Sequence, residues 1–71
     1  MKPQLGETCN VRIASLGGVV KPMVCVNQIE GVGMEFQPNA EFDLYPPRVS
    51  KVVIKDEDVD RVVSSFNETM L

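Results

Sequence analysis

The sequence predicts an α+β protein that is mainly β: a small, bent antiparallel sheet or open barrel of about five strands, followed by one C-terminal amphipathic helix. Apolar and polar residues alternate in several short runs, and glycines and prolines separate these runs. Near the C-terminus the apolar spacing lengthens to the period of a helix. The chain is expected to form a single domain, residues 1–71. We place the strands at about 7–14, 19–29, 32–37, 41–45 and 49–55, and the helix at about 57–70.

The first two runs are expected to form a hairpin. Cys9 and Val11 alternate with polar residues, and Gly17–Gly18 supplies two residues that tolerate the positive φ of a type I′ turn. With these glycines at the centre of the turn, Cys9 faces Val26, and Cys25 points to the opposite face of the sheet. A register shifted by one residue would place Cys9 opposite Cys25 and allow a disulfide, but it would spoil the apolar pairing. The sequence therefore favours two free, buried thiols.

The next two runs predict a second hairpin. Pro38–Asn39 is a turn sequence, because proline presets φ at one turn position and asparagine tolerates the next. After this turn, Phe42 and Leu44 lie on one face of the expected strand, and Asp43 and Tyr45 lie on the other.

The last strand and the helix follow Pro46–Pro47, which ends the preceding strand because proline has no N–H to donate. Three consecutive apolar residues, Val52–Ile54, indicate a strand that is buried on both faces. Asp56 is placed to cap the helix, since its side chain can accept a hydrogen bond from the first turn. The residues expected on the buried face of the helix are Val59, Val62, Val63, Phe66 and Met70.

The segment Gly6–Val11, followed by a hairpin, resembles the start of an SH3-like or Tudor-type barrel. The resemblance covers two strands and implies an open SH3-like barrel as the architecture. The aromatic cage residues of Tudor domains are not found in the sequence, so the resemblance concerns architecture and implies no ligand.

The composition argues against an enzyme. The chain has no histidine, which excludes the Ser/His/Asp and Cys/His catalytic systems and His-ligated zinc or haem. Two cysteines without further soft ligands make an incomplete zinc site, so we expect no cofactor. The sequence also lacks the apolar segment of a signal peptide and any apolar run near the ~20 residues that span a membrane. We therefore expect a soluble, cytoplasmic protein.

Charge is unevenly distributed along the chain. Residues 1–35 carry three acidic and three basic side chains, whereas residues 36–71 carry seven acidic and four basic ones, so the net charge of −3 belongs to the second half. Such a surface repels nucleic acid but suits a basic surface on another protein. We expect a non-enzymatic protein–protein interaction module: a small acidic regulator, inhibitor or accessory subunit that binds a larger protein. The expected contact residues are Asp56, Glu57, Asp58 and Asp60 at the start of the helix, and Glu35, Glu41, Asp43 and Tyr45 on the solvated face of the second hairpin.

Two other functions remain open on the sequence. Asp56, Asp58 and Asp60 have the spacing of the first three ligands of an EF-hand loop, which suggests a weak calcium or magnesium site. However, Arg61 stands where that loop needs glycine, Asn67 stands where it needs glutamate, and an acid-rich first helical turn explains the same aspartates. The other alternative is a structural homo-oligomer in which exposed strand edges pair.

Overall fold

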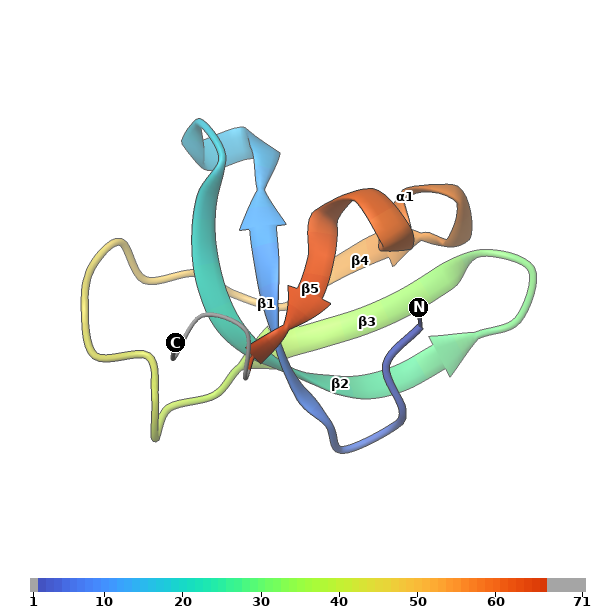
Figure 1. Cartoon of the computed structure of the whole chain (residues 1–71), viewed down its shortest axis with the longest axis horizontal. Helices are drawn as coiled ribbons and strands as arrows, with labels where there is room; N and C mark the ends of the chain where they lie inside the picture. The colour runs from blue at the N-terminus through green and yellow to red at the C-terminus, as the bar shows by residue number, and fades with distance from the viewer. Residues whose placement is uncertain (1, 67–71) are drawn as a thin grey trace.

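The computed structural model of the chain describes residues 2–66, which form one antiparallel sheet and one α-helix. The sheet has five strands in the order β4-β3-β2-β1-β5 and curls into a half-barrel (Figure 1). This arrangement confirms the predicted α+β, mainly β fold. The elements in chain order are β1 (Thr8–Ile13), a 3-10 turn η1 (Ala14–Leu16), β2 (Val19–Ile29), β3 (Gly33–Pro38), β4 (Val52–Lys55), α1 (Asp56–Val62) and β5 (Val63–Ser65).

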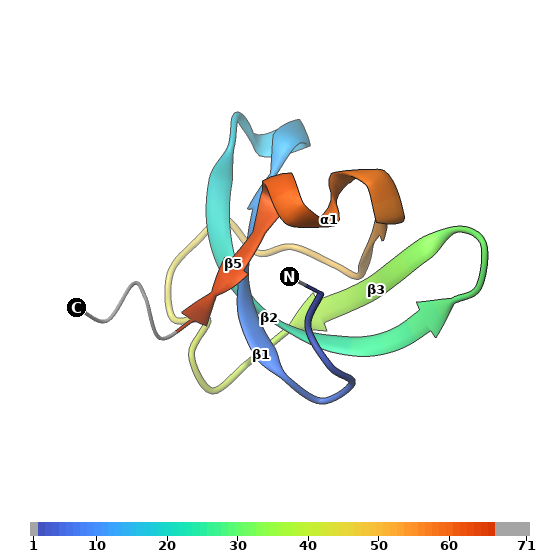
Figure 2. The same cartoon turned by 45° about the vertical axis from the view of Figure 1, so that its right-hand side comes forward.

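The long strand β2 connects the two halves of the sheet. β1 pairs with the first half of β2, up to Val24, whereas β3 pairs with the second half, from Met23 to Ile29. A β-bulge between Cys25 and Asn27 bends β2 within this second half. The helix α1 joins the two edge strands β4 and β5, and it contacts β1 and β3 as well (Figure 1 and Figure 2). It therefore covers one open side of the half-barrel.

The core lies on the concave face of the sheet, beneath α1. The apolar residues of β1 share this buried face as predicted, but Asn10, on the opposite face, is buried as well. Half-buried apolar residues from the 49–51 segment, β4 and α1 pack against the core. The core residues are Cys9, Val11, Ile13, Met23, Cys25, Met34, Phe36, Val59 and Val63.

The predicted register of the first hairpin is wrong by three residues. Cys9 pairs with Met23 rather than with Val26. The reason is that the connection is longer than a two-residue turn: η1 comes first, and Gly17 and Gly18 follow with φ of 75° and 88°. In the observed register Cys25 shares the buried face with Cys9, and both are free thiols.

The predicted strand at 41–45 is not formed, and β3 pairs directly with β4. The backbone N–H groups of Phe42 and Asp43 both donate to the carbonyl oxygen of Asn39, which closes a turn instead of starting a ladder. The segment from Asn39 to the start of β4 is thus an irregular connection, and its Pro46–Pro47 peptide bond is cis.

The last predicted strand is shorter than expected and lies at the edge of the sheet. It begins at Val52 instead of 49, and Val53 is exposed, so the expected burial on both faces is wrong. The close approach of β4 to β3 depends on Gly33, where a Cβ would overlap the carbonyl oxygen of Ile54.

The predicted helix is cut short, because α1 ends at Val62 and the chain continues as β5. Lys55 rather than Asp56 occupies the cap position, and no side-chain cap is made. Val59 and Val63 are buried as the helical stripe predicted, but Val63 pairs with Val11 of β1. Two adjacent β-branched residues favour a strand, and the edge of β1 offers backbone groups to pair with. The expected contribution of Met70 lies outside the described residues.

Candidate functional site

An ion pair between Lys21 and Asp43 is buried beneath the connection between β3 and β4. Lys21 Nζ lies 2.6 Å from Asp43 Oδ1, and the two side chains are only 5% and 3% exposed. Lys21 Nζ also donates a hydrogen bond of 2.6 Å to the carbonyl oxygen of Tyr45. Removing two charges from water costs several kcal/mol each, and their mutual attraction at this short distance offsets that cost. The pair therefore fixes the position of the connection over the sheet.

Asn39 closes the same connection from its other side. Its carbonyl oxygen accepts from Asp43 N at 2.8 Å, and its Oδ1 accepts from Glu41 N at 3.0 Å. Its Nδ2 donates to Thr8 Oγ1 at 2.9 Å, which ties the turn to β1. Arg48 donates from its guanidinium to the carbonyl oxygen of Asp43 at 3.2 Å. These bonds order the backbone on both sides of Asp43.

Three apolar or aromatic side chains of this connection face solvent. Phe42 is 43% exposed, Leu44 is 66% exposed and Tyr45 is 75% exposed, although Asp43 between them is buried. The ring centroid of Phe42 lies 4.9 Å from that of Phe66, the residue that follows β5. We call residues Phe42–Tyr45 the apolar loop. The expected exposure of Asp43 and the expected burial of Phe42 and Leu44 are wrong, whereas Tyr45 faces solvent as predicted.

The structure separates the predicted contact residues of the second hairpin. Glu41 and Tyr45 are exposed on or beside the apolar loop. Asp43 is buried, because its carboxylate forms the ion pair with Lys21. Glu35 is half-buried in β3, where it pairs with Val53 of β4 rather than joining the loop.

The acidic residues predicted at the start of the helix lie together in α1, but Asp56 and Asp58 already form ion pairs with basic side chains. Asp56 lies 3.2 Å from Lys2 Nζ, and Asp58 lies 2.7 Å from the Arg61 guanidinium. Glu57 and Asp60 are exposed. Among residues 2–66, no three acidic or cysteine side chains are grouped closely enough to hold a metal ion. The geometry therefore gives no support to the predicted cation site.

The two thiols are poor nucleophiles in this environment. Burial raises the pKa of Cys9 to about 12, and the nearby charges of Cys25 and Glu7 add to the shift. Burial also raises the pKa of Cys25, against a smaller lowering effect of a backbone hydrogen bond from Asn27. Nucleophilic and metal-binding chemistry need the thiolate, so the protonated thiols act as small apolar core residues.

Sequence reasoning missed Lys21, the residue that organises the loop. The sequence does contain an indication that Lys21 is buried, because Lys21 alternates with Met23 and Cys25, which lie on the buried face of β2. A lysine at such a position needs an acidic partner elsewhere in the chain.

No known protein family, curated protein or solved structure matches the chain. Within the part of the chain that the structure describes, no helix is long and apolar enough to cross a membrane.

Proposed function

We propose that this protein is a cytoplasmic, non-enzymatic module that binds a larger protein through the apolar loop, as a regulator, inhibitor or accessory subunit. The observation that supports this function is the exposure of Phe42, Leu44 and Tyr45 on a loop held by the buried Lys21–Asp43 pair.

The arrangement has the physical properties of a binding epitope. Aromatic side chains such as that of Tyr45 supply a large share of the affinity of many protein interfaces, since they bury much area with few rotatable bonds. A loop that is already ordered loses less conformational entropy when it binds. Lys21 and Asp43 order this loop by an interaction that is hidden from the partner, so the surface is left to the apolar side chains.

The proposed partner presents an apolar pocket with a basic group at its rim. The pocket would receive Leu44 and Tyr45, which are the most exposed apolar side chains of the loop. The basic group would face Glu41, which is exposed beside Phe42. The acidic net charge of the chain favours the encounter with such a partner.

The test replaces Leu44 and Tyr45 together by serine and quantifies cross-linked partners by mass spectrometry. A control variant replaces Leu5 and Val20, two exposed apolar residues outside the loop, by serine. We expect the loop variant to lose a partner at least about tenfold, because each side chain is expected to contribute roughly 1 kcal/mol or more. The control should keep this partner, and circular dichroism should show both variants folded. Equal recovery of the same partners with the wild-type chain and the loop variant would contradict the proposal.

A further inference from the structure

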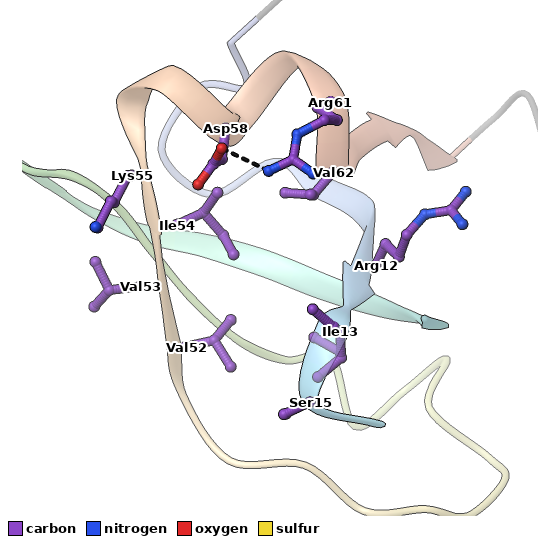
Figure 3. Close-up of a pocket in the computed structure, with 11 residues that line it drawn as sticks. Arg12, Ile13, Ser15, Val52, Val53, Ile54, Lys55, Asp58, Arg61 and Val62 are labelled. Atoms are coloured by element: carbon purple, nitrogen blue, oxygen red, sulfur yellow. Dashed lines mark hydrogen bonds and ion pairs between the residues drawn. The ribbon is translucent and has the colours of Figure 1, made fainter. Parts of the chain in front are cut away.

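A groove opens on the other side of the molecule, between β4 and the end of β1. Its volume is about 320 Å³, and α1 closes one end of it. In Figure 3, Val52 and Ile54 of β4 point across the groove toward Ile13 of β1, and Val62 of α1 lies above them. These apolar side chains pack against the core, so the groove has an apolar floor that is continuous with the protein interior.

The outer edge of β4 provides backbone groups for another strand. Asp56 N donates to the carbonyl oxygen of Val32, and hydrogen-bonded pairs alternate along an antiparallel ladder. It follows that Val52 and Ile54 direct their backbone groups toward β3, whereas Val53 directs its N–H and C=O outward. Within residues 2–66, β4 has no strand on this outer side. An extended peptide can therefore pair with β4 without breaking an existing bond.

The charges around the groove favour an acidic occupant. Arg12, Lys55, Arg61 and Asp58 line it, and Asp58 is already paired with Arg61 at 2.7 Å. The rim thus carries a net positive charge, although the whole chain carries −3. In Figure 3, Lys55 points to the face of β4 away from the groove floor, where it would lie beside the outward side chains of an added strand.

We propose that the β4 groove binds an extended segment of a partner protein, in which apolar residues alternate with acidic residues. The segment adds to β4 as a further strand. Its apolar side chains cover Val52 and Ile54, and its carboxylates, on the opposite face of the added strand, lie beside Lys55. This site does not involve the apolar loop, and it holds whether or not the loop binds a partner.

Pairing with a second copy of the chain is less favourable than this occupant. A two-fold pairing centred on Val53, whose N–H and C=O face outward, places Lys51 of one copy opposite Lys55 of the other. Like charges directly opposite each other destabilise a strand pair.

The experiment titrates the isotope-labelled chain with a short, end-blocked peptide of alternating valine and glutamate and follows the backbone amides by NMR. We expect the largest shifts at Val53 and Lys55, together with slower hydrogen exchange of the Val53 amide. A peptide of alternating valine and lysine, and one of alternating serine and glutamate, should each bind at least about fivefold more weakly.

Two variants identify the mode of binding. Val53→Pro removes the outward N–H but no bond to β3, and proline is tolerated at such edge positions. It should weaken binding of the valine–glutamate peptide about tenfold, whereas Val53→Ala, which keeps the N–H, should stay within about threefold of wild type. Lys55→Glu should reverse the preference between the glutamate and lysine peptides, and this test remains if the proline variant does not fold. The proposal is overturned if Val53→Pro folds and binds as well as Val53→Ala, or if the lysine peptide binds the wild-type chain equally well. It is also overturned if sedimentation shows that the free wild-type chain is a dimer and that Val53→Pro is a monomer.

Discussion

Apolar and polar residues alternate in both β1 and the apolar loop, but the apolar residues of β1 are buried, whereas in the loop Asp43 is buried and the apolar residues are exposed. In β1, Cys9 and Val11 are buried and Arg12 is exposed. In the loop, Leu44 is exposed and Asp43 is buried. The difference shows that alternation decides which side chains face the core where ladder hydrogen bonds keep the backbone extended. In the apolar loop, which has no such ladder, the buried Lys21–Asp43 pair decides which side chain faces the core.

The largest expected effect on stability comes from removing the buried carboxylate of Asp43. Asp43→Ala leaves the Lys21 ammonium buried without its ion-pair partner, so we expect the free energy of unfolding to fall by about 3–5 kcal/mol. This is a large part of the ~5–15 kcal/mol that is typical of a domain. Urea unfolding followed by circular dichroism measures the change.

Two matched variants sharpen this result. Glu41→Ala removes an exposed carboxylate two residues away and should change the stability by no more than about 0.5 kcal/mol. Replacing Lys21 by Met and Asp43 by Leu together should restore most of the stability, because no unpaired charge stays buried. If Asp43→Ala is no more destabilising than Glu41→Ala, the ion pair does not hold the loop.

The second expected effect compares the reactivity of thiols in the two regions. At pH 8 a pKa of about 12 leaves Cys9 with about a thousandfold less thiolate than its ordinary value of 9.0 would give. A cysteine introduced by Leu44→Cys is exposed and should react with iodoacetamide at the rate of a free thiol. Peptide mapping by mass spectrometry separates the two sites, and a Cys9 rate within tenfold of the loop cysteine would contradict the buried environment of β1.

The same shift has a defined sign for stability. The pKa of Cys9 is higher in the folded chain than in the unfolded chain, so its proton stabilises the fold fully below about pH 9. This contribution is lost as the pH rises from about 9 toward 12. The fold should therefore weaken in alkaline solution.

The smallest expected effect concerns the contact that joins the loop to β5. Phe42→Ala removes the ring that packs on Phe66 at 4.9 Å and should lower the stability by about 1 kcal/mol, as the ring is only partly buried. Tyr45→Ala is the control, because its ring is far more exposed, and it should have a smaller effect. Equal losses in the two variants would mean that the Phe42–Phe66 contact does not stabilise the loop.

Local patterns were sufficient for the parts of the fold in which each residue's role depends on its neighbours in sequence. The alternation at Cys9 and Val11 predicted the buried face of β1, and the apolar spacing predicted that Val59 and Val63 are buried. The register was not predictable in this way, because η1 adds residues to a connection that the glycine pair alone suggested would be tight.

The candidate sites depended even more on contacts between distant residues. Glu41 and Tyr45 were predicted and are exposed, but Lys21 was missed and Asp43 was placed on the wrong side. The β4 groove was not predictable, since it is formed by segments that are far apart in the chain.

The sequence by itself determined the fold class of this protein: a mainly β chain with one amphipathic helix after the strands of the first half. Only the tertiary structure decided the register of the first hairpin, the end of the helix at Val62 and which side chains of the apolar loop are buried or exposed. The physical reason is that side-chain periodicity is a local property, whereas strand pairing and buried charge pairs are settled between residues that meet only when the chain folds.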